Sequence, residues 1–436
     1  MAELEKGSKK LLNAWAFYDW ANSVYSLVIA SAIFPIFYGA LFKEKGIVTV
    51  EIFGGAIRST PLITYTTAAA FLMVAVLSPL LSGIADYVGN KKTFMKFFCY
   101  LGALSCISLY FFNLDNIYLS LLSYFFGLIG FWGSLVFYNS YLPDIAHKEQ
   151  QDSTSAKGYS LGYIGSVLLL IFNLGMVMFP AIFGLSDDGS GSVEAMKISF
   201  ITVGLWWIIF SQYSFYYLPK GNKTGHKVTS AVIFNGFREL KSVYQSLTSN
   251  LKLKRYLAAF FIYSMAVQTV MLVATYFGEQ EINWGNDDAK TIGLIGSILI
   301  IQLVAVLGAF LTSKASSRFG NIKTLIVINF VWVLLCITAF FIFEPLHFYI
   351  TAGVVGLVMG GIQSLSRSTY SKFLPQTKDT TSYFSFYDVA EKIGIVIGML
   401  IYGFIDQVTG SMRNAILFLV VFFIIGVILL FRVPKK

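Results

Sequence analysis

The segments Asp86-Tyr87-Val88-Gly89-Asn90-Lys91-Lys92-Thr93 and Ser317-Arg318-Phe319-Gly320-Asn321-Ile322-Lys323-Thr324 are two copies of one pattern. Their Gly, Asn, Lys and Thr residues align at a constant offset of 231 positions. Each copy follows the second apolar stretch of its half of the chain. The pattern predicts a duplicated architecture in which both halves repeat the same order of helices.

The composition predicts what kind of helices these are. Of 436 residues, 56% are hydrophobic and only 13% are charged, and the mean hydropathy is +0.69. Soluble globular chains are about 45–50% apolar and about 25% charged. The values exclude a soluble enzyme, a disordered protein and a coiled coil, and they predict an integral membrane protein with many spans. The aromatic content of 17% suits a protein anchored at two membrane interfaces.

The hydropathy pattern predicts twelve spanning helices, since about 20 mainly apolar residues are needed to cross a bilayer. The expected spans are 14–42, 61–86, 96–112, 118–140, 159–184, 194–217, 256–280, 288–312, 322–343, 346–372, 380–407 and 410–432.

Basic residues orient these spans. With both termini in the cytoplasm, 25 of the 32 Lys and Arg residues lie in cytoplasmic segments and 6 lie outside. Lys and Arg collect in cytoplasmic loops of membrane proteins, so this topology is the expected one. The same bias accounts for the net charge of +9 without a nucleic-acid partner.

The longest hydrophilic segment divides the chain into three parts. We expect an N-terminal six-helix bundle at 1–217, a cytoplasmic linker at 218–255 and a C-terminal six-helix bundle at 256–436. An amphipathic helix on the cytoplasmic face is one interpretation of the linker, and a tether with incidental periodicity is the other. The apolar residues at helical spacing are Ile233, Phe237, Leu240, Tyr244 and Leu247.

The first copy of the repeat resembles the signature loop of the major facilitator superfamily, whose members are built from parallel six-span repeats. Asp86, Gly89 and the two lysines that follow fit that signature, but Ser82 stands where it usually has Gly. In the second copy Ser317 replaces the acid. The resemblance implies that Asp86, Gly89 and Lys91 form a cytoplasmic gate, with helix capping and topology as the alternative role.

Four further segments resemble the vacuole-effluxer-like branch of this superfamily, which contains yeast autophagy-related vacuolar amino-acid effluxers and bacterial relatives. The four segments are 13–23 (NAWAFYDWANS), 138–144 (YNSYLPD), 157–163 (KGYSLGY) and 360–368 (GGIQSLSRS). The resemblance implies an all-α membrane protein with twelve helices in two pseudo-symmetric bundles. It also implies a monomeric transporter of a bacterial inner membrane, with spans one, four, seven and ten around the cavity.

Charged residues inside predicted spans are costly and therefore candidates for function. Asp19 is a candidate proton carrier or a partner at the interface between the halves. Asp388 and Lys392 are spaced to pair along one helix, which leaves Glu391 without a local partner and makes it a second proton carrier. A cytoplasmic gate of ion pairs and a substrate site are equal alternatives for Asp388 and Lys392, and Arg367 could join such a gate with Asp19 or Asp144 as its partner.

Neutral polar and aromatic residues in the spans are candidates for substrate binding. Amide side chains could hydrogen-bond a zwitterion, and the aromatic residues could supply apolar walls with polar tips. Hydrogen bonds between helices are the alternative for each of them. The candidates are Asn22, Tyr25, Trp132, Tyr138, Asn139, Tyr263, Gln268 and Gln363.

The sequence contains no G-x-x-x-x-G-K-[ST] loop, no H-E-x-x-H and no cysteine pair at metal-ligand spacing, so we expect no cofactor, no metal and no enzymatic activity. The leading hypothesis is a secondary transporter of a small polar solute, an amino acid or short peptide by resemblance. A proton or substrate gradient would drive it within the lipid bilayer. Efflux of amphipathic compounds is the alternative, and a membrane enzyme or sensor is the least favoured.

Overall fold

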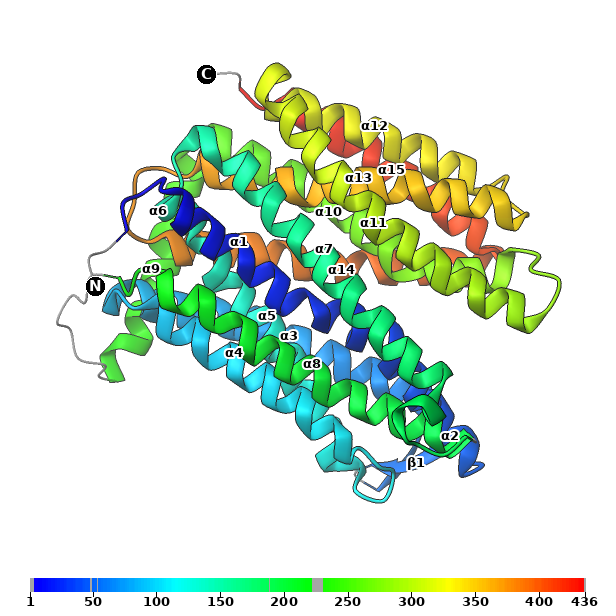
Figure 1. The fold of residues 1–436 in the computed structure, drawn as a ribbon. Helices are drawn as coiled ribbons and strands as arrows, with labels where there is room; N and C mark the ends of the chain where they lie inside the picture. Colours follow the sequence, from blue (N-terminus) through cyan, green and yellow to red (C-terminus); the bar gives the residue numbers. More distant parts are fainter. Residues whose placement is uncertain (1–3, 48, 53, 188, 222–229, 435–436) are drawn as a thin grey trace.

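The computed structural model describes residues 4–47, 49–52, 54–187, 189–221 and 230–434. Long helices run side by side in two bundles (Figure 1). The first bundle contains α1 (Lys9–Val24), the π-helix η1 (Tyr25–Ile33), α2 (Phe34–Glu44), α3 (Ser59–Val88), α4 (Lys91–Ser108), α5 (Ile117–Ser140), α7 (Gln151–Met178) and α8 (Gly189–Tyr217). The second bundle contains α10 (Leu251–Glu281), α11 (Asp287–Phe319), α12 (Asn321–Ala339), α13 (Pro345–Phe373), α14 (Thr380–Thr409) and α15 (Met412–Phe431).

Short elements connect these helices. A two-stranded antiparallel hairpin joins α2 to α3, with Thr49 paired to Arg58. This hairpin is not predicted by the hydropathy pattern. The short elements are β1 (Thr49–Ile52), β2 (Gly55–Arg58), η2 (Leu109–Phe111), α6 (Leu142–Ile145), η3 (Lys148–Gln150) and η4 (Pro180–Phe183).

The helices confirm the prediction of an all-α membrane protein. Within the described residues, eleven helical segments are long and apolar enough to cross a bilayer. The first of them runs from Lys9 to Glu44 and combines α1, η1 and α2. The 30-residue α14 is not among the eleven, and it carries three charged residues near its middle. With α14 the structure is compatible with the twelve predicted spans.

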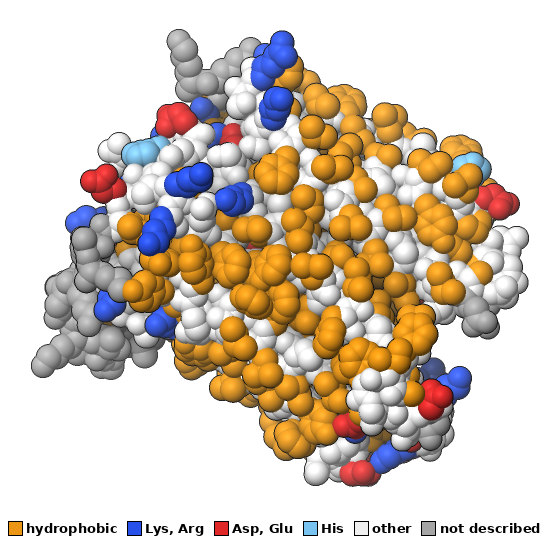
Figure 2. Space-filling model, viewed as in Figure 1, with side chains coloured by type: hydrophobic (Ala, Val, Ile, Leu, Met, Phe, Trp, Pro, Cys, Tyr) orange, Lys and Arg blue, Asp and Glu red, His pale blue; other side chains and the backbone are white. Residues whose placement is uncertain are grey.

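The described buried hydrophobic residues form two clusters, one for each bundle. Trp207 lies in the first cluster and Trp332 in the second, and both are fully buried. Tyr163 of α7 belongs to the second cluster, because α7 packs against α11 and α13 across the interface. Hydrophobic side chains also cover much of the outer surface (Figure 2), as expected for helices that face lipid.

Glycine makes both repeat turns possible. Gly89 ends α3 with φ of 67°, and Gly320 ends α11 with φ of 85°. A side chain is disfavoured at such angles because its Cβ meets the backbone. A tight turn is therefore present in both copies of the pattern.

The linker contains helix α9 (Ser230–Ser249), which packs mainly against α3. The side chains of Ile233, Phe237 and Leu240 lie outside the described part of the structure. Leu247 is buried, whereas Tyr244 is 61% exposed. Val243 is buried as well, and both Val243 and Leu247 belong to the hydrophobic cluster of the second bundle.

The first span contains a π-helical stretch that the sequence analysis did not predict. In η1 the hydroxyl of Ser31 donates to the carbonyl of Ser26 at 2.8 Å, five residues earlier. π-Helical turns are rare and occur mostly near functional sites. This one contributes Tyr25, Ser26 and Ser31 to the cavity described below.

Candidate functional site

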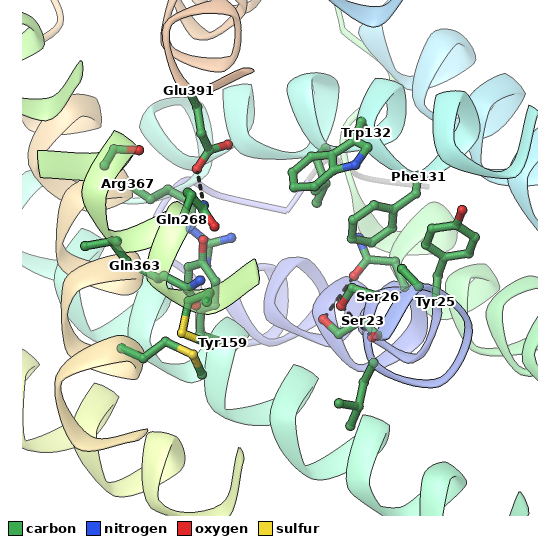
Figure 3. Close-up of a pocket in the computed structure, with 18 of the residues that line it drawn as sticks. Ser23, Tyr25, Ser26, Phe131, Trp132, Tyr159, Gln268, Gln363, Arg367 and Glu391 are labelled. Carbon is green, nitrogen blue, oxygen red and sulfur yellow. Dashed lines mark hydrogen bonds between the residues drawn. The ribbon is translucent and has the colours of Figure 1, made fainter. Parts of the chain in front are cut away.

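A cavity of about 380 Å³ lies between the two bundles. It reaches from Asp19 and Arg367 to the η1 residue Ser31 and to Leu272 of α10. Figure 3 shows Gln268, Gln363 and Glu391 on one side of this cavity, and Tyr25, Phe131 and Trp132 on the other. Because both bundles supply its walls, any change in their relative position changes the cavity.

The floor of the cavity is an ion pair that joins the bundles. Both terminal nitrogens of Arg367 on α13 lie 3.2 Å from Oδ2 of Asp19 on α1. The hydroxyl of Tyr138 donates to the same oxygen at 2.8 Å. Only 2% of the Arg367 side chain and 6% of the Asp19 side chain are exposed. This pair is one of the two that the sequence proposed for Arg367.

Arg367 is also held by α7. Its Nε donates to the hydroxyl of Ser155 at 2.9 Å, and its guanidinium lies 4.2 Å from the ring of Tyr159. Gly158 lies between these two residues in sequence, and a Cβ at this position would collide with the Asp19 carboxylate. Glycine is therefore needed here so that α7 can approach the ion pair.

A second charged group lies on α14. The ammonium of Lys392 lies 2.9 Å from Asp388 and 2.9 Å from Glu391, which confirms the predicted pairing of Asp388 with Lys392. The expectation that Glu391 lacks a partner is wrong. It accepts hydrogen bonds from both Lys392 and Gln268, each at 2.9 Å. Side chains of neighbouring residues on a helix point in different directions. The lysine side chain is nevertheless long enough for its ammonium to reach the Glu391 carboxylate.

Lys392 also contacts the opposite bundle. Its ammonium lies 3.5 Å from the ring centre of Trp132 on α5, and only 1% of its side chain is exposed. Glu391 is 18% exposed and lines the cavity, as does Asp388. The cluster of Asp388, Glu391 and Lys392 has two carboxylates for one ammonium, so it presents a formal excess of one negative charge.

Neutral polar groups complete the walls. Tyr163 donates to Gln363 at 2.6 Å across the bundle interface, and Asn139 accepts from Arg367 at 3.2 Å. Within the described residues, the amide nitrogen of Asn22 and the hydroxyl of Tyr25 are buried without a hydrogen-bond partner. Such groups are costly unless something pairs with them.

The structure brings most of the predicted site residues to one cavity. Tyr138 is an exception, since it is fully buried beside the cavity floor and contacts Asp19 instead. Lys392 lies behind the wall, under Trp132. The predicted residues that line the cavity are Asp19, Asn22, Tyr25, Trp132, Asn139, Tyr263, Gln268, Gln363, Arg367, Asp388 and Glu391.

The predicted gate residues Asp86 and Lys91 lie outside the cavity, at the end of the molecule where α1 begins (Figure 1). Asp86 accepts hydrogen bonds from the backbone nitrogens of Thr381 at 3.3 Å and Ser382 at 2.7 Å, in the first turn of α14. Lys91 pairs with Asp144 and donates to Thr380 at 3.0 Å. We call this contact between α3 and α14 the first latch.

A second contact joins the bundles at the same end, between α7 and the α11–α13 side. Asp152 of α7 lies 2.6 Å from the ammonium of Lys372, and it accepts from Ser316 and Asn321, each at 2.9 Å. We call this contact the second latch. The end that carries both latches is the closed end, and the end where β1, β2 and η4 lie is the open end (Figure 1).

Asp152, Tyr159 and Tyr163 are site residues that the sequence pattern does not predict. Segment 157–163 carries a family resemblance, and it holds Gly158 and both tyrosines. Ser317 stands where the first copy of the repeat has Asp86. A carboxylate for the second latch must therefore come from another part of the chain. Only the packing of α7 against α11 identifies Asp152 as that carboxylate.

Known proteins resemble this chain along nearly its whole length. The model of the family described as vacuole effluxer Atg22 like matches residues 7–436. The MFS-type transporter YxiO of Bacillus subtilis (strain 168) is 31% identical over 432 residues, with 97% of this chain and 95% of YxiO covered. Autophagy-related protein 22 of Kluyveromyces lactis is 23% identical over 472 residues, with 96% of this chain and 92% of that protein covered.

Solved structures share the fold. The E. coli fucose:proton symporter FucP superposes with a TM-score of 0.67 at 15% identity, with 98% of each chain covered. The proton:xylose symporter XylE superposes with a TM-score of 0.70 at 11% identity, with 98% of this chain and 95% of XylE covered. At such identities the likeness concerns the arrangement of helices alone.

Proposed function

This chain belongs to the Atg22-like vacuole effluxer family of MFS-type membrane transporters, and we propose that it moves a small polar organic solute by alternating access. The observation that carries the proposal is the cavity, whose walls come from both bundles and whose floor is the Asp19–Arg367 pair between them. Rocking of two bundles about such a site is the general mechanism of this fold.

The closed end is proposed to face the cytoplasm, because the Lys and Arg bias of the loops favours that orientation. The latches then block the cytoplasmic path while the cavity extends away from it. The state described is accordingly an outward-facing one. Transport requires that both latches and the floor ion pair separate while contacts form at the open end.

An amino acid or short peptide is the proposed solute. The cavity volume lies near the lower end of the roughly 300–1,000 Å³ range of small-molecule sites, which favours a small solute over a bulky amphipathic one. Glu391 offers a carboxylate to an ammonium group, and Asn22 offers an unpaired amide donor to a carboxylate. Trp132 and Phe131 provide an apolar wall for a side chain.

Counter-flow in proteoliposomes tests the proposal. Vesicles loaded with an unlabelled amino-acid mixture should accumulate labelled amino acid above the level of empty vesicles. Glu391→Ala should reduce this accumulation at least tenfold, because it removes the exposed charge of the cavity. Glu279→Gln is the matched control, since this acid is exposed and does not line the cavity.

Two other results would decide against the proposal. Accumulation of amphipathic cations with none of amino acids or dipeptides would support efflux of amphipathic compounds. Equal accumulation by wild type and Glu391→Ala would show that the cavity residue takes no part.

Proton coupling is proposed to act through Asp19 or Glu391. Protonation of Asp19 would remove the charge that holds Arg367 across the interface, and so would favour separation of the bundles. The Asn variant imitates that neutral state permanently, so transport by Asp19→Asn should lose its dependence on pH. Unpairing the buried Arg367 should also cost roughly 3–5 kcal/mol of stability.

Glu391→Gln is the companion variant for this test. If Asp19 carries the proton, Glu391→Gln should keep the wild-type pH profile while it binds substrate more weakly. Should both variants retain the wild-type profile and still accumulate substrate with a proton gradient, neither acid is the carrier.

A further inference from the structure

A second cavity lies away from the transport path, where α4 begins and α8 ends. Its volume is about 1100 Å³, and neither Asp nor Glu is among the described residues that line it. Four lysines line it from three parts of the chain: Lys10 from α1, Lys92 and Lys96 from α4, and Lys220 from the segment after α8. Four formal positive charges therefore surround one space.

These lysines have no carboxylate partner among the described residues. Lys92 is only 6% exposed, and its ammonium donates to the carbonyl of Leu218 at 2.7 Å. Lys10 lies 4.4 Å from the ring centre of Tyr217, and Lys96 lies 5.4 Å from that of Phe215. The neighbouring Lys91, by contrast, is paired with Asp144.

A buried ammonium without a counter-ion is costly, and like charges around one cavity raise that cost further. Carbonyl and aromatic contacts compensate only in part. An anion in the cavity would neutralise Lys92 and relieve its repulsion with Lys96 and Lys220. The lining thus indicates a ligand with at least one strongly acidic group, such as a phosphate.

The surroundings of the cavity indicate what carries that phosphate. Tyr216 lines the cavity and is 56% exposed. Along the same two helices, Phe97 and Leu104 of α4 and Ile209 of α8 are 58–60% exposed. Figure 2 shows Lys and Arg side chains near the closed end, beside a surface covered with hydrophobic side chains. A polar anion next to an apolar belt matches a phospholipid headgroup with its acyl chains.

We propose that this cavity binds the headgroup of an anionic phospholipid. The phosphate would lie among Lys92, Lys96 and Lys220, with the acyl chains along α4 and α8. Clusters of Lys and Arg next to a bilayer bind anionic headgroups in this way. Bound lipid would tie the start of α1 and the end of α8 to the loop that carries the first latch.

The test measures lipid binding by the full-length protein in nanodiscs. The probe is phosphatidylglycerol in a phosphatidylcholine background, measured by competition against a fluorescent phosphatidylglycerol. The wild type should prefer phosphatidylglycerol to phosphatidylcholine at least tenfold. The double variant Lys96→Gln/Lys220→Gln should lose at least fivefold of that preference, and Lys96→Arg/Lys220→Arg should keep it.

Lys314→Gln/Lys323→Gln is the matched control. Both residues are exposed, and Lys323 occupies the repeat position that corresponds to Lys92, yet neither lines the cavity. The control should bind phosphatidylglycerol like the wild type. Lys92 is left unchanged in all variants because its buried hydrogen bond contributes to folding.

Three results would overturn the proposal. The first is equal affinity for phosphatidylglycerol and phosphatidylcholine in the wild type. The second is an equal loss of preference in the control variant. The third is full displacement of the probe by millimolar inorganic phosphate, which would make the cavity a site for soluble anions.

Discussion

The two latches at the closed end occupy corresponding places in the two halves, and both take their carboxylate from the first bundle, but from different elements of the repeat. In the first latch the acid is Asp86, at the end of α3 on the repeat loop, and it reaches the first turn of α14. In the second latch the repeat loop has Ser317, and the acid is Asp152, in the first turn of α7. A carboxylate contact between the bundles has been kept, while the acid has exchanged its place at the repeat loop for one on the helix that faces the loop.

The two latches show that the interface requires a carboxylate contact at this place. It does not require the acid to stand at the aligned position of the repeat. Asp86 interacts with backbone N–H groups at a helix N-terminus, where a negative charge is stabilised by the helix dipole. Asp152 instead accepts from three side chains, one of them the ammonium of Lys372. The second latch therefore depends more strongly on charge than the first.

The largest effect is expected when both latches are broken, in Asp86→Asn/Asp152→Asn. Hydrogen bonds to charged groups contribute about 1.5–3 kcal/mol each. Loss of one such bond at each latch should shift the balance between the shut and separated states of the closed end by about a hundredfold or more. Spin labels at Lys148→Cys and Lys314→Cys should report a longer distance across the closed end. An unchanged distance would show that the latches do not hold this end shut.

Asp152→Asn alone should have the next largest effect. Lys372 would keep its charge but lose its carboxylate, and transport should slow by about tenfold. Initial rates of counter-flow measure this effect, and Asp187→Asn, an exposed acid outside the latches, is the control. Rates equal to those of the control would remove Asp152 from the gate.

Asp86→Asn should have a smaller effect, of about twofold to fivefold on transport, because asparagine is also a good helix N-cap. The protein should remain folded, as judged by its size-exclusion profile. Its spin-label distances should move in the same direction as in the double variant. Unchanged kinetics and distances would leave Asp86 with a capping or topological role only.

The smallest effect is expected for Ser317→Asp, which restores the acid of the repeat pattern in the second copy. Ser317 is exposed, so the new carboxylate should face solvent and change stability by no more than about 0.5 kcal/mol. It should not rescue Asp152→Asn in the counter-flow assay. Rescue would show that the aligned position can supply the latch after all.

The sequence predicted the class of fold and the approximate position of its helices, because long apolar stretches and the bias of Lys and Arg are local properties. It also predicted that Asp388 pairs with Lys392, since that contact lies within one helical turn. It did not predict the partner of Glu391, and it left Arg367 with two candidate partners. The partners of Glu391 and Arg367 depend on how far their neighbours' side chains extend and on how the two bundles pack against each other.

The π-helical stretch η1 was missed for a related reason. The hydrogen-bond register of the backbone inside a span is set by neighbouring helices. A single apolar pattern does not contain that information. The four-lysine cavity was missed because its members are separated by more than 200 positions, from Lys10 to Lys220.

What the sequence by itself determined is a duplicated, helical membrane transporter, with glycine turns at Gly89 and Gly320 and a family likeness along nearly its whole length. These properties follow from composition, periodicity and short motifs, which act over a few turns of helix. What only the tertiary structure decided is which partner each charged side chain meets: Asp19 meets Arg367, Asp152 meets Lys372, and Lys392 meets the ring of Trp132. The partners lie 220 to 348 residues apart or on opposite bundles, so the packing of the bundles alone brings them together.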